Sequence, residues 1–231
     1  VDRHVQLVEK AVDPPGEAKP DWTIICEIAK RMGYQDKFSY GSVEEIFEEI
    51  RKVVPQYKGI TYERLRKTPG GIQWPCPSES HPGTSTMFIE KFATPDGFGH
   101  FQVVQYKPPA EVPDNEYPFM LTTGRVLFHY HTGTMTRKTR RLNSEVPTGF
   151  VELNVEDAKM LGVRDGDLVK LVTRRGELKV KAKVTESILK GVVFVPFHFS
   201  ECPANVLTNP ARDPTGMPEF KVCAVKVEKA G

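Results

Sequence analysis

The sequence predicts an α+β, mainly β protein in which a helical, loop-rich first half precedes a closed β-barrel. After Tyr117, six or so short apolar runs are separated by turn residues and one helical pattern, which is typical of a barrel rather than an open parallel sheet. Before it, two amphipathic helical patterns are followed by stretches rich in proline and glycine. The 231 residues, 39% of them apolar, suffice for one large or two small domains with a proper core.

Two helices are expected in the first half. Asp21 follows a proline and is the expected N-cap of the first helix, and Gly33 suits its C-terminal stop. The apolar positions of this helix fall on one face: Trp22, Ile25, Ile28, Ala29 and Met32. A second helix is expected to begin at the capping box of Ser42 and Glu45 and to end before Pro55.

The segment that follows these helices is the expected link to the barrel. Residues 59–99 are rich in proline, glycine and serine and are too long for an ordinary connection, which favours a functional or partner-covered loop. Residues 101–106 resemble a strand. Residues 107–117 contain three prolines and three acids, which interrupt regular structure. We therefore expect a helical, loop-rich domain over residues 1–112 and a barrel over residues 113–231.

The barrel elements follow from short-range patterns. We expect strands at residues 119–123, 150–153, 168–173, 178–184, 192–197 and 222–227. Asn154 is the expected cap of a short helix that ends at Gly162, and residues 174–177 are expected to form a hairpin turn. Lysines alternate with apolar residues over 178–184, so one face should be solvated. Residues 192–197 lack alternation and should be buried on both faces.

Composition narrows the class of function. A net charge of +2 without a clustered basic face gives no case for nucleic acid. No window approaches the roughly 18 apolar residues of a membrane span, and the first 20 residues lack the apolar core of a secretory signal. A cytoplasmic location is expected, with export as the passenger of a partner subunit as the alternative. The four cysteines form no C-x-x-C pair, and they are expected to be buried rather than catalytic or metal-binding.

One segment has the residue chemistry of a site for a polar, anionic ligand. An apolar strand ends at Gly124, where the missing Cβ allows close approach, and Arg125 offers a planar fork of donors suited to phosphate. His129, His131 and several threonines add donors along the following loop. A solvated loop with a chance histidine pair is the alternative. A metal site is disfavoured because no third ligand stands at a matching spacing.

Two further segments stay open to two interpretations each. Residues 137–141 carry four positive charges in five positions, which is typical of a solvated face or a subunit contact, with a phosphate or acidic partner as the alternative. Asn205, Asn209 and Asp213 have donors and acceptors that suit a guanine ring. The same residue types also form turns, and residues 209–216 certainly contain turns.

The segments taken in order resemble a known family. YPFMLTTGRVLFHYHTGTMTR, FVELNVEDAKMLGVRDGDLVKLVTRRGE, GVVFVPFHFSE, ANVLTN and PEFKVCAV resemble the molybdopterin-dinucleotide-binding domain of formate dehydrogenases, within the molybdenum and tungsten oxidoreductases. PPGEAKPDWTIICEIAKRMGY and GIQWPC also resemble the segment that precedes this domain, so the similarity covers nearly the whole chain. It implies that the barrel is a six-stranded double-psi β-barrel. It also implies a bis-molybdopterin guanine dinucleotide cofactor with molybdenum or tungsten.

The resemblance also implies which residues contact this cofactor. Backbone N–H contacts are expected at Val126 and Leu127, whose side chains have no donors, and Lys221 is expected to pair with the pterin or a phosphate. The complete implied set is Gly124, Arg125, Val126, Leu127, His129, His131, Thr132, Thr134, Phe197, His198, Asn205 and Lys221. No residue of this chain is expected to be catalytic or to ligate the metal.

The chain departs from the family pattern in three motifs. It lacks the cysteine cluster for a [4Fe–4S] centre, the selenocysteine or cysteine metal ligand with its catalytic histidine, and the arginine near the substrate. We therefore expect the chain to be the pterin-clamping C-terminal portion, either a split subunit or a fragment, of an enzyme that interconverts formate and CO2. A larger polypeptide would carry the cluster and the metal ligand, and further subunits would transfer electrons. The alternatives are another pterin enzyme, such as a nitrate reductase, and a non-catalytic barrel that serves as an interaction module.

Overall fold

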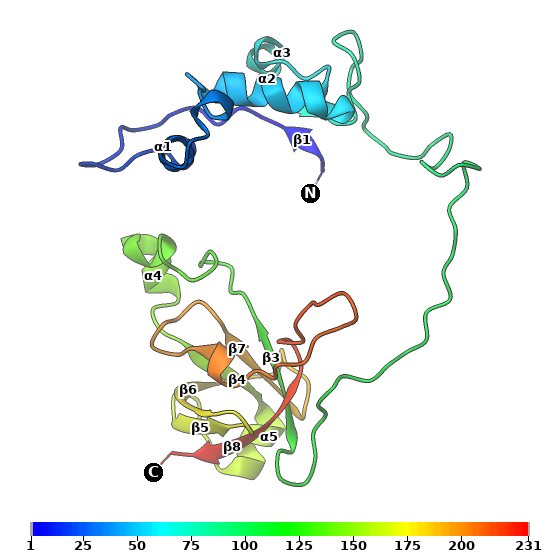
Figure 1. Cartoon of the computed structure of the whole chain (residues 1–231). Coiled ribbons are helices and arrows are strands. Elements are labelled where there is room, and N and C mark those ends of the chain that lie inside the picture. The colour runs from blue at the N-terminus through cyan, green and yellow to red at the C-terminus, as the bar shows by residue number, and fades with distance from the viewer. Residues whose placement is uncertain (1, 231) are drawn as a thin grey trace. The chain divides into compact units, whose positions relative to one another are not determined.

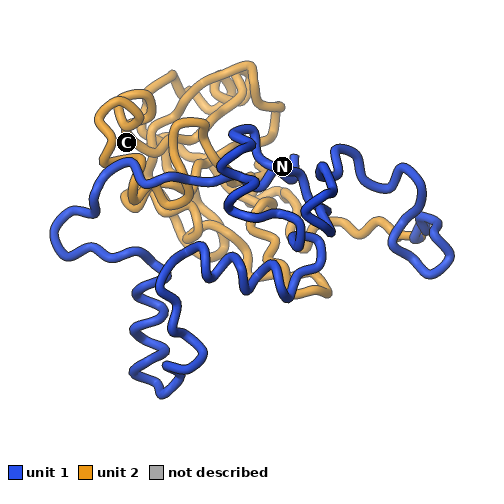
Figure 2. Tube along the Cα trace, turned by 90° about the horizontal axis from the view of Figure 1, so that it is seen from above, with its two compact units in different colours: residues 1–102 blue, residues 103–231 orange. Residues whose placement is uncertain are grey.

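The chain divides into two units, which Figure 2 distinguishes by colour. The computed structural model describes residues 2–230, and the division falls between Gln102 and Val103. The predicted boundary at residues 112–113 stays a prediction. Residues just before it already bond to the second unit, because the Ala110 amide donates to Glu219 at 2.9 Å and Glu111 accepts from Arg174 at 2.7 Å.

The first unit contains the predicted helices and some elements that the sequence patterns did not indicate. Its regular elements are β1 (His4–Val5), α1 (Asp21–Arg31), η1 (Gln35–Lys37), α2 (Val43–Val53), η2 (Pro55–Tyr57), α3 (Tyr62–Lys67) and β2 (Ile72–Gln73) (Figure 1). Strands β1 and β2 pair antiparallel. Helix α3 and strand β2 lie inside the predicted 59–99 loop, so this segment is more ordered than its composition indicated.

The two helix starts differ in how their first amide groups are satisfied. The Ser42 side chain accepts from the Glu45 amide at 3.2 Å, which confirms the predicted capping residue of α2. The prediction for α1 was one residue off, because Pro20 occupies the N-cap and Asp21 is the first helical residue. Asp21 therefore contributes negative charge to the first turn rather than a cap hydrogen bond.

The first unit has a small core. Its fully enclosed apolar residues are Ile60, Leu65, Ile72 and Cys76, with Phe47, Tyr57 and Trp74 packed around them. The apolar face predicted for α1 stays open within the unit, since Ile25, Ile28 and Met32 are 56%, 53% and 68% exposed. Amphipathic patterning identified the helix correctly, but within this unit little packs on its apolar face.

The predicted strand over residues 101–106 is wrong. This segment has no regular structure, and Phe101, Val103 and Val104 are at least 85% exposed. A strand requires a neighbour that completes its backbone hydrogen bonds, and here the chain runs extended without one. Alternating apolar residues are therefore not sufficient for strand formation.

The second unit is a closed six-stranded barrel. Its strands are β3 (Phe119–Gly124), β4 (Phe150–Asn154), β5 (Leu168–Val172), β6 (Glu177–Thr185), β7 (Val192–Pro196) and β8 (Cys223–Lys229), in the order β3-β7-β4-β6-β5-β8. Strands β3 and β7 pair parallel, as do β4 and β6, and the remaining pairs are antiparallel. This topology confirms the predicted barrel.

Side-chain alternation fills the barrel interior. In β6, Leu178, Val180 and Ala182 are buried and the intervening lysines are exposed, as predicted. The prediction for residues 192–197 was wrong, because β7 alternates too: Val193 and Val195 are buried, whereas Phe194 is only half-buried. The outer face of β7 is thus partly covered by side chains such as Phe150, whose ring centroid lies 6.5 Å from that of Phe194.

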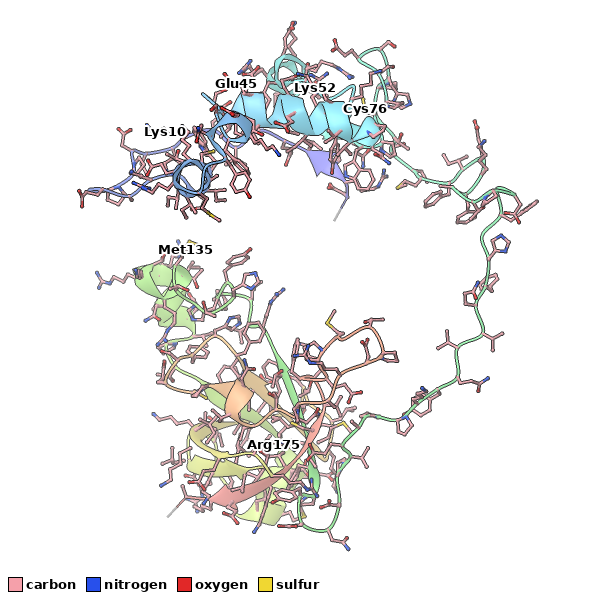
Figure 3. All side chains as sticks on the ribbon, in the orientation of Figure 1. Lys10, Glu45, Lys52, Cys76, Met135 and Arg175 are labelled. Carbon is pink, nitrogen blue, oxygen red and sulfur yellow. The ribbon has the colours of Figure 1, made fainter. Side chains whose placement is uncertain are left out.

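Local signals place the connections of the barrel correctly. Asn154 accepts from the Glu156 amide at 2.9 Å and caps α5 (Val155–Leu161), and Gly162 ends this helix in the left-handed region at φ +63°. Val172 pairs with Glu177, so the predicted hairpin turn is present but covers residues 173–176, one residue earlier than expected. Arg175, labelled in Figure 3, belongs to this turn and donates to Glu111 and to the Leu207 carbonyl. In the described part of the chain, no helix is both long and apolar enough to cross a membrane.

Shortening a side chain in the barrel core should lower the free energy of unfolding far more than shortening one on the barrel surface. Leu171 is fully buried in β5, so Leu171→Ala should lower the free energy of unfolding by about 2–5 kcal/mol. Leu168 lies in the same strand but is 45% exposed, and Leu168→Ala is the matched control with an expected cost of about 1 kcal/mol or less. Urea unfolding of both variants measures the difference. Equal costs would contradict the strand register.

Candidate functional site

Three chain segments meet at one end of the barrel because of the strand pairing. In the parallel pair β3–β7, Gly124 stands beside Pro196, so both strands end at the same level. Strand β8 runs the other way, with Cys223 beside Leu121, so the residues just before β8 also lie at this end. Figure 1 shows α4 (Arg140–Glu145) at this end and α5 at the opposite end. The barrel thus gathers the predicted site segments from positions about 70–100 residues apart.

Gly124 is needed where the two parallel strands end. A Cβ at this position would lie 2.7 Å from the Phe194 ring, so a larger residue would displace that ring. The Gly124 carbonyl accepts from the Phe197 amide at 3.1 Å, which carries the parallel pairing one residue beyond β7. The glycine therefore brings Phe194 and Phe197 close to the start of the Arg125 loop.

Two cations stand at this end of the barrel without a carboxylate partner. The Arg125 guanidinium lies 5.8 Å from the centroid of the Phe197 ring, and the Lys221 ammonium donates to the Thr123 carbonyl at 2.8 Å. Both side chains are exposed. Within residues 2–230, no carboxylate lies within ion-pair distance of either cation. The barrel end therefore presents positive charge that is free to bind an anion.

His198 links the β7 loop to the loop that follows β3. Its ring is 1% exposed; Nδ1 donates to the His131 carbonyl, and Nε2 accepts from the Val126 amide at 2.9 Å. Burial lowers the pKa of His198 below its usual value, which favours the neutral tautomer that these two bonds require. The Val126 amide, expected to contact the cofactor, is thus already engaged by His198.

His129 also lies inside the protein rather than at its surface. Its ring is 5% exposed; Nε2 lies 2.7 Å from the Val146 carbonyl and Nδ1 lies 3.1 Å from the Thr136 hydroxyl. Its ring also packs edge-on against Phe199, with centroids 5.4 Å apart. Since both ring nitrogens are engaged within the chain, His129 anchors the loop internally.

The other predicted residues of this loop face solvent. Leu127, His131, Thr132 and Thr134 are exposed, and the two threonine hydroxyls lie 2.7 Å apart. His131 adopts φ +46°, an unusual conformation for a residue with a side chain, and its carbonyl accepts from His198. The loop thus combines a buried anchor with a row of exposed donors.

The asparagine and aspartate residues after β7 separate into two groups. Asn205 is exposed in the short helix η4 (Ala204–Val206), so its side-chain amide is free to meet a ligand. Asn209 is buried and donates to the carbonyls of Glu219 and Val222, and Asp213 accepts from Thr215 and Met217. The turn interpretation therefore holds for Asn209 and Asp213.

An anchor that the sequence patterns did not single out lies beside the histidines. Arg137, in the short helix η3 (Thr136–Lys138), donates to both carboxylate oxygens of Glu201 at 2.8 and 2.7 Å. Its guanidinium also lies 5.1 Å from the Phe199 ring centroid. The basic run 137–141 signalled a charged surface, but its first arginine is neutralised within the chain because the β7 loop supplies an acid.

The arrangement fits a polyanionic cofactor. Arg125 and Lys221 offer unpaired positive charge, and the exposed threonines offer hydroxyl donors. An open groove of about 370 Å³ is lined by Arg125, Leu127 and Phe194, and also by Glu152, whose carboxylate is paired with Lys183. Among the described residues, no three His, Cys, Asp or Glu side chains gather as metal ligands, and all four cysteines are buried as free thiols.

Comparison with known proteins identifies the class to which the barrel belongs. Residues 119–224 match the family described as molydopterin dinucleotide binding domain, and residues 1–31 match the family described as molybdopterin oxidoreductase. Residues 119–224 are therefore similar to the molydopterin dinucleotide binding domain family. This confirms the resemblance seen in the sequence.

Relatives that match the whole chain are more specific. The chain is 56% identical to the F420-dependent formate dehydrogenase subunit alpha of Methanocaldococcus jannaschii, a match that covers 99% of this chain and 34% of that protein. It is 52% identical to the F420-dependent formate dehydrogenase 1 subunit alpha of Methanococcus maripaludis, with the same coverage. The assimilatory nitrate reductase catalytic subunit of Bacillus subtilis is 43% identical over 98% of the chain and 33% of that subunit.

These matches also define the extent of the similarity. The chain spans about a third of the length of the curated relatives it matches, and it corresponds to the C-terminal part of formate dehydrogenase alpha subunits. Among solved structures, acetylene hydratase from Pelobacter acetylenicus aligns with a TM-score of 0.69 at 20% identity, over 95% of this chain and 34% of that one. At this identity the likeness supports the fold alone.

Removal of the Glu201 carboxylate, which pairs with Arg137, should loosen the loop that Arg137 anchors. Burial raises the pKa of Glu201, but hydrogen bonds from Arg137 and from its own backbone outweigh burial, so the pKa lies below its usual value. Glu201→Gln should therefore cost about 1 kcal/mol of unfolding free energy at pH 7, because the pair is partly exposed. Denaturant unfolding at several pH values measures this cost.

The pH dependence of this cost follows from the depressed pKa. The stabilisation is complete above the usual glutamate pKa of about 4.3 and disappears as the pH falls through the lower pKa of the folded state. Glu186→Gln, at an exposed position outside this pair, is the matched control and should change little. A cost for Glu201→Gln that stays constant across this pH range would contradict the ion-pair role.

Proposed function

We propose that this chain is the cofactor-clamping C-terminal part of the alpha subunit of a molybdenum- or tungsten-dependent formate dehydrogenase. The observation that carries the proposal is the pair of unpaired cations, Arg125 and Lys221, at the barrel end where β3 and β7 finish. This barrel matches the molydopterin dinucleotide binding domain family, and the relatives that match 99% of the chain at 48–56% identity are formate dehydrogenase alpha subunits.

The residues of this chain would bind and orient a bis-molybdopterin guanine dinucleotide. When bound, this cofactor and its metal supply the redox centre at which formate and CO2 interconvert. Arg125 and Lys221 neutralise phosphate charge, and the hydroxyls of Thr132 and Thr134 donate hydrogen bonds. His129 and His198 hold the loop that presents these groups. Asn205 offers an exposed amide to the guanine edge.

The complete enzyme requires structure beyond this chain. We propose that the remainder of the alpha subunit carries the [4Fe–4S] cluster and the metal ligand, and that further subunits carry electrons onward. The names of the two relatives described above support F420 as the electron acceptor. A cytoplasmic location is part of the same proposal. The exposed apolar residues of α1 and of the 101–106 segment support an extensive contact with the proposed remainder of the alpha subunit.

Two other functions are distinguishable from this proposal. A nitrate reductase is the second candidate, because the assimilatory enzyme of Bacillus subtilis is 43% identical over almost the whole chain. A non-catalytic interaction module is the third. It would use the basic run 137–141 as a docking surface, but Arg137 is already neutralised by Glu201.

The natively purified complex that contains this chain provides the decisive test. We expect molybdenum or tungsten, two guanine nucleotides per metal ion, and formate-dependent reduction of an acceptor dye. Mass spectrometry of its polypeptides should identify the sequence that carries the cysteine cluster. Nitrate reduction without formate oxidation would favour the second candidate, and the absence of both metal and pterin would favour the interaction module.

Loss of the Arg125 guanidinium should weaken cofactor retention. A charge-assisted bond of this kind contributes about 1.5–3 kcal/mol, so Arg125→Ala should release guanine nucleotide faster on gel filtration of the complex. Lys181 is exposed in β6, which is three strands from β3 in the barrel order, and Lys181→Ala is the control expected to retain the cofactor. Unchanged pterin content in Arg125→Ala would refute the phosphate-binding role.

A further inference from the structure

The His198 ring is the one described side chain that bonds to both ends of the loop from Val126 to His131. His198 lies 72 residues after Val126 in the chain. Its Nε2 accepts a hydrogen bond from the Val126 amide, and its Nδ1 donates a hydrogen bond to the His131 carbonyl. Aromatic rings of Phe197, Phe199 and His129 surround it, at centroid distances of 4.8, 6.2 and 5.8 Å. This enclosure holds the ring in one orientation between the two loops.

The two bonds are compatible with one protonation state only. An imidazole that donates from Nδ1 and accepts at Nε2 must be neutral. A proton on Nε2 would direct an N–H group at the Val126 N–H group, so the ring and the backbone would separate. The bond to the His131 carbonyl would survive protonation, because Nδ1 carries hydrogen in both states. Protonation of His198 would therefore break the loop's hydrogen bond at its Val126 end.

The surroundings of the ring also disfavour a charged state. The groups that face it from the β3 loop are Arg125, His129 and His131, and none of them is acidic. On the β7 side the neighbouring rings are apolar, and beyond Phe199 Arg137 is neutralised by Glu201. A positive charge on His198 would thus lack a carboxylate partner in this part of the structure.

We infer that His198 is a positioning residue whose neutral form holds the Arg125–His131 loop in its cofactor-binding shape, and whose protonation releases that loop. The inference rests on the proposed cofactor-binding function. In this inference His198 does not contact the cofactor directly. It holds Val126, which is the neighbour of the phosphate-binding Arg125. It also makes cofactor retention depend on pH.

The sign of this dependence follows from the burial of the ring. The pKa of His198 is lowered in the folded protein by burial, relative to an unfolded value of about 6.5. The neutral link is therefore fully present above about pH 6.5 and weakens as the pH falls from there through the depressed folded-state pKa. Retention should be constant between neutral and mildly alkaline pH and should fall on acidification.

Three substitutions distinguish the hydrogen-bonding role of His198 from a role in packing alone. His198→Gln places a non-titrating amide oxygen near Nε2, so it should keep most of the retention and remove the acid loss. His198→Asn keeps a donor near Nδ1 but has no acceptor within reach of Val126. His198→Phe keeps an aromatic ring without either hydrogen bond, and it should release the cofactor about tenfold faster at neutral pH. His81→Gln, in the first unit, is the matched control.

The experiment measures release of guanine nucleotide from the purified complex between pH 5 and 8, for the wild type and each variant. The expected result is acid-dependent release in the wild type and His81→Gln, a flat profile in His198→Gln, and fast release at every pH in His198→Phe. His198→Asn should release about as fast as His198→Phe. An unchanged acid profile in His198→Gln, or wild-type retention in His198→Phe, would overturn the inference.

A second measurement does not depend on the cofactor. Long-range ¹H–¹⁵N spectra of the full chain labelled in histidine should show His198 neutral, with hydrogen on Nδ1, at pH 7. If the complex contains no pterin, the proposed function is wrong, and so is the inference that His198 controls cofactor retention. The tautomer of His198 can still be measured in that case. A His198 ring protonated on Nε2 at pH 7 would refute the link even in a complex that carries pterin.

Discussion

The candidate site depends on the parallel pairing of β3 with β7. Parallel strands cannot be joined by a tight turn, so the 67 residues between Gly124 and Val192 leave the barrel end and return to it. The register sets Gly124 beside Pro196, and the loops that follow must therefore emerge together. A shift of one residue in this register would displace the loop after β7 relative to the loop after β3, and would separate His198 from the Val126 amide.

Charge pairing distinguishes the arginines that stabilise the fold from Arg125, which is free to bind a ligand. Arg137 is paired with Glu201, and Arg174 and Arg175 share Glu111, each bond formed between distant parts of the chain. Arg125 lies at the end of the parallel pair and meets an aromatic ring instead of an acid. An anionic cofactor would supply the missing negative charge, whereas the paired arginines would have to lose a carboxylate first.

The histidines show how burial changes the interpretation of a motif. Spacing and resemblance placed His129, His131 and His198 together in a cofactor site, and the structure does bring them together. Only His131 is exposed, however. His129 and His198 are buried, and both ring nitrogens of each form hydrogen bonds within the chain. Two of the three histidines thus act on the loop, and the loop carries the exposed donors.

The sequence by itself determined the local elements, namely the Ser42 and Asn154 caps, the left-handed Gly162 and the alternation in β6, and it carried the resemblance of the barrel to a known family. These follow from interactions within a few residues or from residue order. The tertiary structure alone decided the absence of a strand at 101–106, the half-buried Phe194, and the partners of His198 and Arg137. The physical reason is that hydrogen bonds, ion pairs and burial depend on groups far apart in the chain. A local sequence pattern does not specify which distant group will form the contact.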